Sequence, residues 1–247
     1  MYPYIHIVLP SYTVLALLGA FCSVVLVFVR LERYEIDFDL FVKLIFLCAV
    51  GGFCGSKLLF AITRIPWLIS NFSLYNLIML LPQSGLVFYG GLFGVLITIA
   101  IYTHQDTSLK KRAYMLCSPA IPLFHYFGRI GCFLTGCCYG KEYTIPHYFG
   151  IIEIDRIPVQ LIEALAEFVL FIVLLLIEKI KPKANLLQIY LMSYAVIRFL
   201  TEFLRGDDIR GHWLGLSTSQ WISIFIITYY CIKMYKRNIV IMNRSVY

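Results

Sequence analysis

Long apolar segments with few charged residues run through most of this chain of 247 residues. A helix needs about 20 consecutive apolar residues to cross the hydrocarbon core of a bilayer. Seven segments come close to that length, at roughly 8–29, 41–62, 86–103, 113–135, 159–178, 186–204 and 218–234. Because backbone groups in lipid must be hydrogen-bonded internally, we expect each segment to be a helix. The sequence therefore predicts an all-α, polytopic membrane protein with seven transmembrane helices.

Composition excludes a water-soluble fold and argues against nucleic acid as a partner. Hydrophobic residues make up 60% of the chain and charged residues 14%. The net charge is +7, but in a membrane protein an excess of Lys and Arg reflects basic cytoplasmic loops. We find no repeats, linkers or low-complexity tracts. Residues 1–247 are therefore expected to form a single integral membrane domain, without a cleavable signal peptide.

The distribution of Lys and Arg predicts the orientation in the membrane. One set of connections carries Arg30, Arg33, Lys110, Lys111, Arg112, Lys179, Lys181, Lys183, Lys233, Lys236, Arg237 and Arg244. The other set carries Arg64, Lys141, Arg156, Arg205 and Arg210. The first set is richer and should be cytoplasmic, which puts the N-terminus outside and the C-terminus in the cytoplasm. On the outer side we expect an amphipathic interfacial element at 67–85 and a polar loop at 136–158.

Two apolar segments contain a buried arginine. His125, Arg129 and Cys132 are spaced i, i+4, i+7, so they share one helix face. An arginine at the bilayer centre costs roughly 2.5–3.5 kcal/mol, and such residues usually face a polar cavity. The alternative is that Arg129 is a structural anchor paired with a carboxylate elsewhere. Gly128 and Gly131 on the same helix permit close approach of a helix or a ligand.

Tyr194, Arg198 and Glu202 form a second stripe, spaced i, i+4, i+8. An Arg198–Glu202 pair is expected, and it leaves guanidinium donors for a phosphate. Two intramembrane arginines indicate an anionic ligand reached from the membrane, and a phospholipid head group fits best. We therefore expect the helices to surround a polar lipid-binding cavity that opens toward the outer leaflet.

Glycines and cysteines add two further features. Gly90, Gly91 and Gly94 start the third segment, where exposed backbone N–H groups can bind an anion. Plain helix packing is the alternative, and the segment offers a break at Gly90-Gly91. The cluster of Cys132, Cys137 and Cys138 is structural, forms a disulfide, or binds metal with His125. Because the usual C-x₂-C spacing is absent, we expect no metal, and we expect no other cofactor.

The segment Gly128-Arg129-Ile130-Gly131-x-Phe133-x-x-Gly136-x-x-x-Gly140 resembles the signature of prolipoprotein diacylglyceryl transferases. Other elements resemble that family in order and spacing, over nearly the whole chain. They are Tyr12, Phe88-Tyr89-Gly90-Gly91-Leu92-Phe93-Gly94, Arg156-x-Pro158-x-Gln160-Leu161-x-Glu163, Tyr194-x-x-x-Arg198-Phe199-x-x-Glu202-Phe203-x-Arg205 and Gly215-Leu216-Ser217-x-x-Gln220.

The resemblance implies a transferase of lipoprotein biosynthesis in the bacterial plasma membrane. Such enzymes move the diacylglyceryl group of phosphatidylglycerol to the lipobox cysteine of a prolipoprotein signal peptide, and glycerol phosphate leaves. Arg129 and Arg198 would then hold the phosphate, with Glu202 and Tyr194 orienting Arg198. The remaining substrate contacts are expected from Tyr12, Gly90, Gly91, Gly128, Cys132, Gly140 and Gln160.

Three polar positions depart from the family pattern. Tyr89 stands in place of its histidine, Cys132 in place of its asparagine, and Cys137 in place of its acidic residue. Competing readings are a paralogue with a different acceptor and a non-catalytic lipid-binding or transport protein. An imidazole has a pKa near ~6.5, which suits proton abstraction. We therefore expect His125 to be the general base. Alternatively His125 only packs between helices, and Tyr89, a water or a phosphate oxygen takes the proton.

Overall fold

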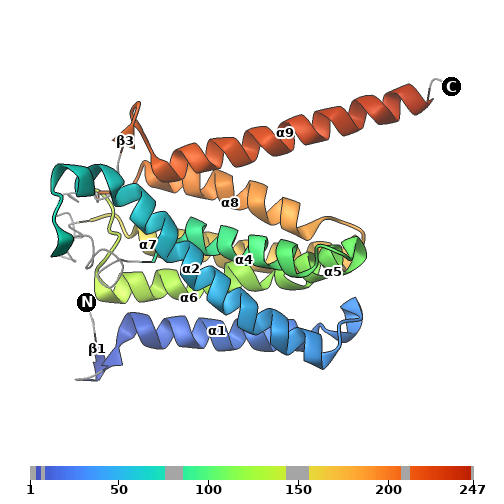
Figure 1. Ribbon diagram of the computed structural model, residues 1–247, viewed down its shortest axis with the longest axis horizontal. Coiled ribbons are helices and arrows are strands. Elements are labelled where there is room, and N and C mark those ends of the chain that lie inside the picture. Colours follow the sequence, from blue (N-terminus) through green and yellow to red (C-terminus); the bar gives the residue numbers. More distant parts are fainter. Residues whose placement is uncertain (1–3, 7–8, 76–85, 143–155, 207–211, 246–247) are drawn as a thin grey trace, which may run out of the picture. The chain divides into compact units, whose positions relative to one another are not determined.

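The computed structural model describes residues 4–6, 9–75, 86–142, 156–206 and 212–245 (Figure 1). This part of the chain is mostly helical, as predicted. Two short antiparallel hairpins accompany the helices: β1 (Tyr4–His6) pairs with β2 (Leu9–Pro10), and β3 (His212–Trp213) pairs with β4 (Leu216–Ser217). The chain divides into two compact units, which we describe separately. One comprises Met1–Phe21 with Pro122–Tyr247, and the other comprises Cys22–Ile121.

The larger unit contains the first half of α1 (Ser11–Val29), most of α6 (Ala120–Thr135), α7 (Val159–Ile180), α8 (Leu186–Glu202) and α9 (Thr218–Ser245). Helix α8 packs against both α7 and α9. Asn185 caps α8 by accepting a hydrogen bond from the Gln188 N–H at 3.1 Å. The start of α9 is a capping box, because Ser217 and Gln220 exchange hydrogen bonds of 2.9 and 3.2 Å.

The smaller unit is built on the pairing of α2 (Phe38–Ser70) with α4 (Phe88–Tyr102). Their glycines face each other at very short range. A Cβ atom on Gly94 would lie 2.1 Å from the carbonyl oxygen of Gly51, and one on Gly90 would lie 2.4 Å from that of Gly55. Small residues of this kind let helix backbones approach closely in lipid. The helix α5 (Thr107–Cys117) completes this unit, beside the short η1 (Glu32–Tyr34).

A buried arginine fastens the end of α5. Arg30 donates from Nη1 to the Leu116 carbonyl at 2.5 Å and from Nη2 to the Met115 carbonyl at 3.3 Å. Carbonyl groups in the last turn of a helix lack partners within the helix, so a cation is favourable there. The core beside it consists of Val27, Leu31, Tyr34, Ile36, Phe41, Leu44, Ile99, Ala113, Leu116 and Ala120.

The surface supports a membrane setting. Three stretches are long and apolar enough to cross a membrane by length and composition, namely Ser11–Phe28, Phe38–Ile65 and Val159–Ile180. Helix α4 is apolar but shorter. Large apolar side chains such as Phe21, Phe46 and Leu165 are about two-thirds exposed, which suits lipid and not water. The chain is thus a helical membrane protein, and the number of seven spans remains a prediction.

Several predicted boundaries were wrong. The segment expected at 113–135 is two helices, α5 and α6, separated at Ser118 and Pro119. Pro119 lacks an N–H and so cannot donate to the Met115 carbonyl one turn back, which accepts from Arg30. Helix α4 is unbroken at Gly90-Gly91, because those glycines pack against α2. Helix α2 continues to Ser70, so the start of the expected interfacial element is part of α2, and 76–85 lie outside the described residues.

Candidate functional site

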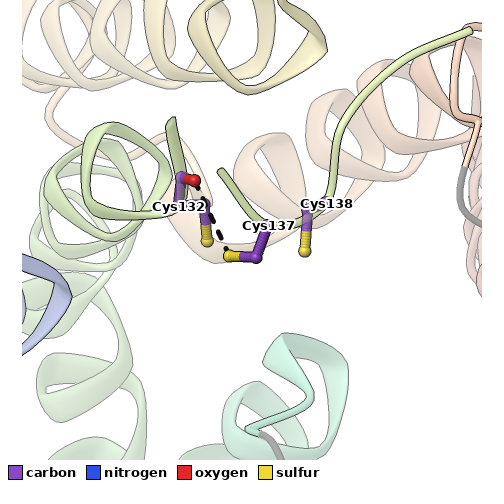
Figure 2. Close-up of side chains that lie close together, drawn as sticks. All are labelled: Cys132, Cys137 and Cys138. Atoms are coloured by element: carbon purple, nitrogen blue, oxygen red, sulfur yellow. Dashed lines mark hydrogen bonds between the residues drawn. The ribbon is translucent and has the colours of Figure 1, made fainter. Parts of the chain in front are cut away.

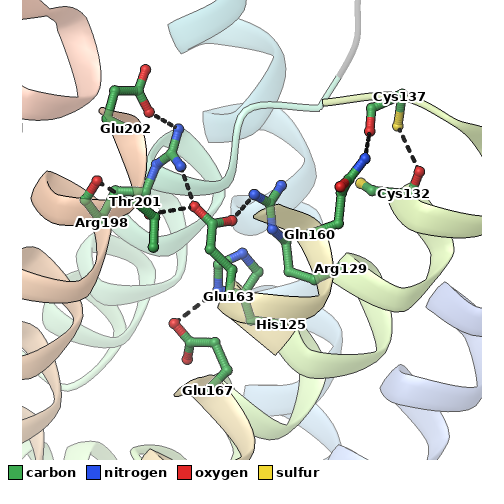
Figure 3. A network of polar contacts seen from close by, with 10 residues as sticks. All are labelled: His125, Arg129, Cys132, Cys137, Gln160, Glu163, Glu167, Arg198, Thr201 and Glu202. Atoms are coloured by element: carbon green, nitrogen blue, oxygen red, sulfur yellow. Dashed lines mark hydrogen bonds and ion pairs between the residues drawn. The ribbon is translucent and has the colours of Figure 1, made fainter. Parts of the chain in front are cut away.

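A single carboxylate joins the two predicted arginines (Figure 3). Oε2 of Glu163 contacts Nη2 of Arg129, and Oε1 of the same group contacts Nη1 of Arg198. The hydroxyl of Thr201 donates to that Oε1 at 2.7 Å. All four residues are buried, and they come from α6, α7 and α8. Glu163 therefore ties three helices together through charge-assisted hydrogen bonds.

Arg198 also contacts a second carboxylate. Its Nη2 pairs with Oε2 of Glu202, one helical turn along α8, which confirms the predicted pair. Arg129 pairs with Glu163 on another segment. Such a pair was expected if Arg129 is a structural anchor. Even so, Nε of Arg129 is buried and has no hydrogen-bond partner among the residues that the structure describes. Each guanidinium offers several N–H donors, so these pairs do not use all of them.

Gly128 adjoins Arg129 and borders open space. A Cβ atom placed on Gly128 would meet no described atom within 4 Å. Gly131, about one turn further along α6, has little space for a side chain, because its Cβ would lie 3.1 Å from the ring of Tyr12. Gly131 thus lets α1 pack closely on α6, as predicted, and this contact places the half-buried Tyr12 beside the signature helix.

His125 is paired within the membrane helices. Its Nδ1 lies 3.2 Å from Oε1 of Glu167, which is completely buried. The imidazole packs edge-on against the Tyr194 ring at 5.3 Å, and that ring stacks on Tyr190 at 5.8 Å. Glu167 from α7 and Tyr194 from α8 thus pack around the imidazole. His125 therefore does not point into lipid.

The loop after α6 is fastened to the ends of α7 and α8. The Lys141 N–H donates to the Leu204 carbonyl at 2.9 Å, and the Gly206 N–H donates to the Tyr139 carbonyl at 3.1 Å. Gly140 has no space for a side chain, because a Cβ there would lie 2.4 Å from the Ile157 carbonyl. The C-terminal ends of α6, which carries Arg129, and α8, which carries Arg198, thus meet at this loop. Gly140 is needed there for close packing.

Three cysteines lie at this junction (Figure 2). The sulfur atoms of Cys132, Cys137 and Cys138 are all within 4.8 Å of one another, and each residue has a free thiol. Gln160 donates from Nε2 to the Cys137 carbonyl at 2.7 Å, so it holds the loop. The pKa of the Cys138 thiol lies below its usual value, because the other two thiols hydrogen-bond to it and because arginines lie nearby.

Tyr89, Gly90 and Gly91 belong to the smaller unit. Tyr89 is buried and its ring stacks on Phe93 at 6.0 Å. Gly90 and Gly91 face α2, which favours helix packing as the reason for these glycines. A role for these residues in substrate binding stays a prediction.

Sequence reasoning missed three members of the network. Glu163 was recognised within a motif but not as the partner of both arginines, and Glu167 and Thr201 were not considered. A signal was present, since Glu163 and Glu167 are spaced i, i+4 within an apolar segment. Carboxylates inside a membrane helix face the bundle interior and pair with one another or with bases.

Comparison with known proteins identifies relatives of this chain. The family model described as prolipoprotein diacylglyceryl transferase matches residues 3–235. A phosphatidylglycerol–prolipoprotein diacylglyceryl transferase of Clostridium tetani is 32% identical over 225 residues, which is 88% of each chain. A second enzyme so named, from Clostridium perfringens, is 33% identical over 88% of this chain and 86% of its own. A third, from Dehalococcoides mccartyi, is 29% identical over 90% and 86%.

Proposed function

Because this chain belongs to the prolipoprotein diacylglyceryl transferase family, we propose that it transfers the diacylglyceryl group of phosphatidylglycerol to the thiol of a prolipoprotein's lipobox cysteine. Glycerol phosphate is the leaving group. The observation that carries this proposal is the buried pair Arg129 and Arg198, held together by Glu163 from a third helix. Such a pair suits a phosphate that enters from lipid.

The arginines stabilise the leaving phosphate. Negative charge develops on its oxygens as the carbon–oxygen bond breaks, and preorganised donors in a dry site lower the barrier most effectively. Glu163 fixes the position of both guanidinium groups before substrate binds, and Glu202 fixes Arg198 from its other side. The unpartnered Nε of Arg129 and the open space at Gly128 support a phosphate position beside α6.

The acceptor thiol must lose its proton, since the thiolate is the nucleophile. We assign the general base to His125, whose Nδ1 lies 3.2 Å from Oε1 of Glu167. Tyr194 packs against the imidazole and helps to hold it in place. Tyr12, Gln160 and Cys132 line the head-group end of the site. In this proposal, Gly140 shapes the loop that borders the site.

The membrane setting of the proposal follows the charge distribution. Seven helices cross the bacterial plasma membrane around a polar cavity open to the outer leaflet, with the N-terminus outside and the C-terminus in the cytoplasm. The shared junction of α6, α7 and α8 supports such a mouth, because it gathers the polar loop ends at one place. Phosphatidylglycerol and the prolipoprotein signal peptide reach the site through the lipid.

A transfer assay tests this proposal. Purified protein is incubated in phosphatidylglycerol-containing micelles with a lipobox peptide, and the product is measured by mass spectrometry. A thioether-linked diacylglyceryl peptide supports the proposal. Lipid binding without turnover would indicate a lipid-binding or transport protein. Turnover with another acceptor, and none with the lipobox peptide, would indicate a paralogue with a different substrate.

A further inference from the structure

The carboxyl end of α6 and the loop that follows it gather three cysteine sulfurs at one point (Figure 2). All three Sγ atoms lie within 4.8 Å of one another, and all three thiols are free. We propose that Cys132, Cys137 and Cys138 bind one zinc ion (Zn²⁺) through their thiolates, with a fourth coordination position open to the acceptor thiol.

The backbone holds the sulfurs in place before any ion binds. The Cys137 N–H donates to the Cys132 carbonyl at 3.1 Å, and Gln160 holds the Cys137 carbonyl from α7. Gly136 and Cys138 have φ values of 72° and 57°, in the left-handed region. Neighbouring side chains in extended backbone point in opposite directions. The left-handed residue turns the chain, so that the adjacent Cys137 and Cys138 present their sulfurs to the same point.

The spacing suits zinc. Zinc–sulfur bonds are about 2.3 Å long and tetrahedral, so the sulfurs around one ion stand ~3.8 Å apart. Sulfurs already within 4.8 Å need side-chain shifts of only about 1 Å to reach that geometry. Thiolates are soft ligands that favour zinc over magnesium or calcium. Structural zinc sites are closed by four protein ligands, whereas three ligands with an open position are typical of catalytic zinc.

The surrounding charge is favourable. Three thiolates and one Zn²⁺ carry one net negative charge, which needs compensation in a partly buried site. Arg205 and Arg129 lie close enough to act electrostatically on the Cys138 sulfur. Cys132 is buried, while Cys137 is exposed, so the ion and a fourth ligand have a route of entry.

A zinc ion at this position would help to deprotonate the acceptor thiol. This part of the proposal rests on the proposed function. A free cysteine thiol has a pKa near ~8.5 and an imidazole near ~6.5, so proton transfer between them is about a hundredfold unfavourable. Coordination to zinc deprotonates a thiol readily. His125, proposed as the base, stands about two helical turns (~11 Å) from Cys132 along α6, so the proton passes to it through water. The metal-held sulfur then attacks the glyceryl carbon. The carbon–oxygen bond breaks, its electron pair leaves with the phosphate, and the thioether product dissociates from the ion.

Metal analysis of the full-length protein provides the first test. Protein purified with reductant and dialysed against zinc should retain one zinc ion per chain. Cys137→Ser and Cys138→Ser should each weaken zinc binding at least about a hundredfold, because changes to outer-shell partners alone cost about 10–100-fold. Cys54→Ser and Cys231→Ser are matched controls at exposed cysteines on other helices and should bind zinc normally. Absence of zinc from the reduced wild-type protein, or a disulfide within the cluster that reforms in its place, would overturn the proposal.

Cobalt substitution tests the fourth position without relying on turnover. Cobalt-loaded protein should show the visible absorption of tetrahedral Co²⁺, and a lipobox peptide with its cysteine should increase sulfur-to-cobalt charge-transfer absorption. The same peptide with serine should not. A spectral change with the cysteine peptide but no thioether product would leave the metal site standing and contradict the proposed function. Full transfer by metal-free protein would contradict the metal proposal alone.

Discussion

Glu163 is the residue on which the candidate site depends. One buried carboxylate holds two guanidinium groups from different helices, and Thr201 supplies it with a further hydrogen bond. Buried charges are expensive to desolvate, so a shared carboxylate stabilises the pair only while all its partners are present. The Glu163 carboxylate also holds the two guanidinium groups at fixed positions, which suits the binding of a phosphate.

Glu163→Gln keeps the shape of the side chain and removes its charge, so two guanidinium groups are left facing each other. Breaking a buried pair typically costs about 3–5 kcal/mol. We expect a lower unfolding temperature in detergent and a transfer rate reduced at least about tenfold. The matched control is Glu142→Gln, whose exposed pair with Arg156 at 3.4 Å should be worth about 0–1 kcal/mol. Equal unfolding temperatures for the two variants would contradict the role given to Glu163.

His125→Ala tests the proposed base. Loss of a general base should reduce the transfer rate roughly 10²–10⁴-fold while lipid binding remains intact. Tyr89→Phe should lose much less, because a phenol with an ordinary pKa near ~10 is a poor base. Both variants are to be compared at saturating lipid, with phosphatidylglycerol binding measured separately. Normal turnover by His125→Ala would show that another group takes the proton.

Sequence reasoning reached the charged residues but not all their partners. The Arg198–Glu202 pair followed from spacing along one helix, and the structure confirms it. The link between Arg129 and Glu163 depends on how two helices pack, which residue spacing within one segment does not reveal. The absent C-x₂-C spacing led us to expect no metal, whereas the clustering of the three sulfurs depends on the left-handed backbone at Cys138, which residue spacing does not reveal.

At the scale of helices, the glycines of α2 and α4 let the two backbones approach closely. Gly94→Ala should destabilise this unit strongly, because the new Cβ would lie 2.1 Å from the Gly51 carbonyl oxygen. Gly128→Ala is the matched control, since its Cβ would meet no described atom within 4 Å. We expect thermal unfolding in detergent to separate the two. Comparable stability of both variants would contradict the close packing of α2 and α4.

Helix positions were more predictable than helix ends. Apolar stretches located α1, α2, α4, α7, α8 and α9 because burial in lipid demands length and continuity. Their limits depend on local hydrogen bonds that an apolar pattern does not encode. The capping box at Ser217 and Gln220 shows this, since that pair was noted for its resemblance to a family motif and proved to start α9.

At the scale of the whole molecule, the charge distribution makes a definite prediction about topology. Single cysteines introduced at Lys141 and Ser108, both exposed, are tested in a background without the exposed native cysteines. An impermeant thiol reagent should label position 141 in intact cells and position 108 only after permeabilisation. The reverse pattern would invert the proposed orientation.

The most direct test of the account is the rate of thioether formation by Arg129→Ala and Arg198→Ala. In the proposed function each change removes a charge-assisted contact to the leaving phosphate in a dry site, so the rate should fall by about a hundredfold or more. Arg33→Ala, at an exposed position in the smaller unit, is the control and should retain wild-type activity. All three proteins should still insert into the membrane. Near-normal rates in both buried-arginine variants would contradict the proposal that these arginines bind the phosphate.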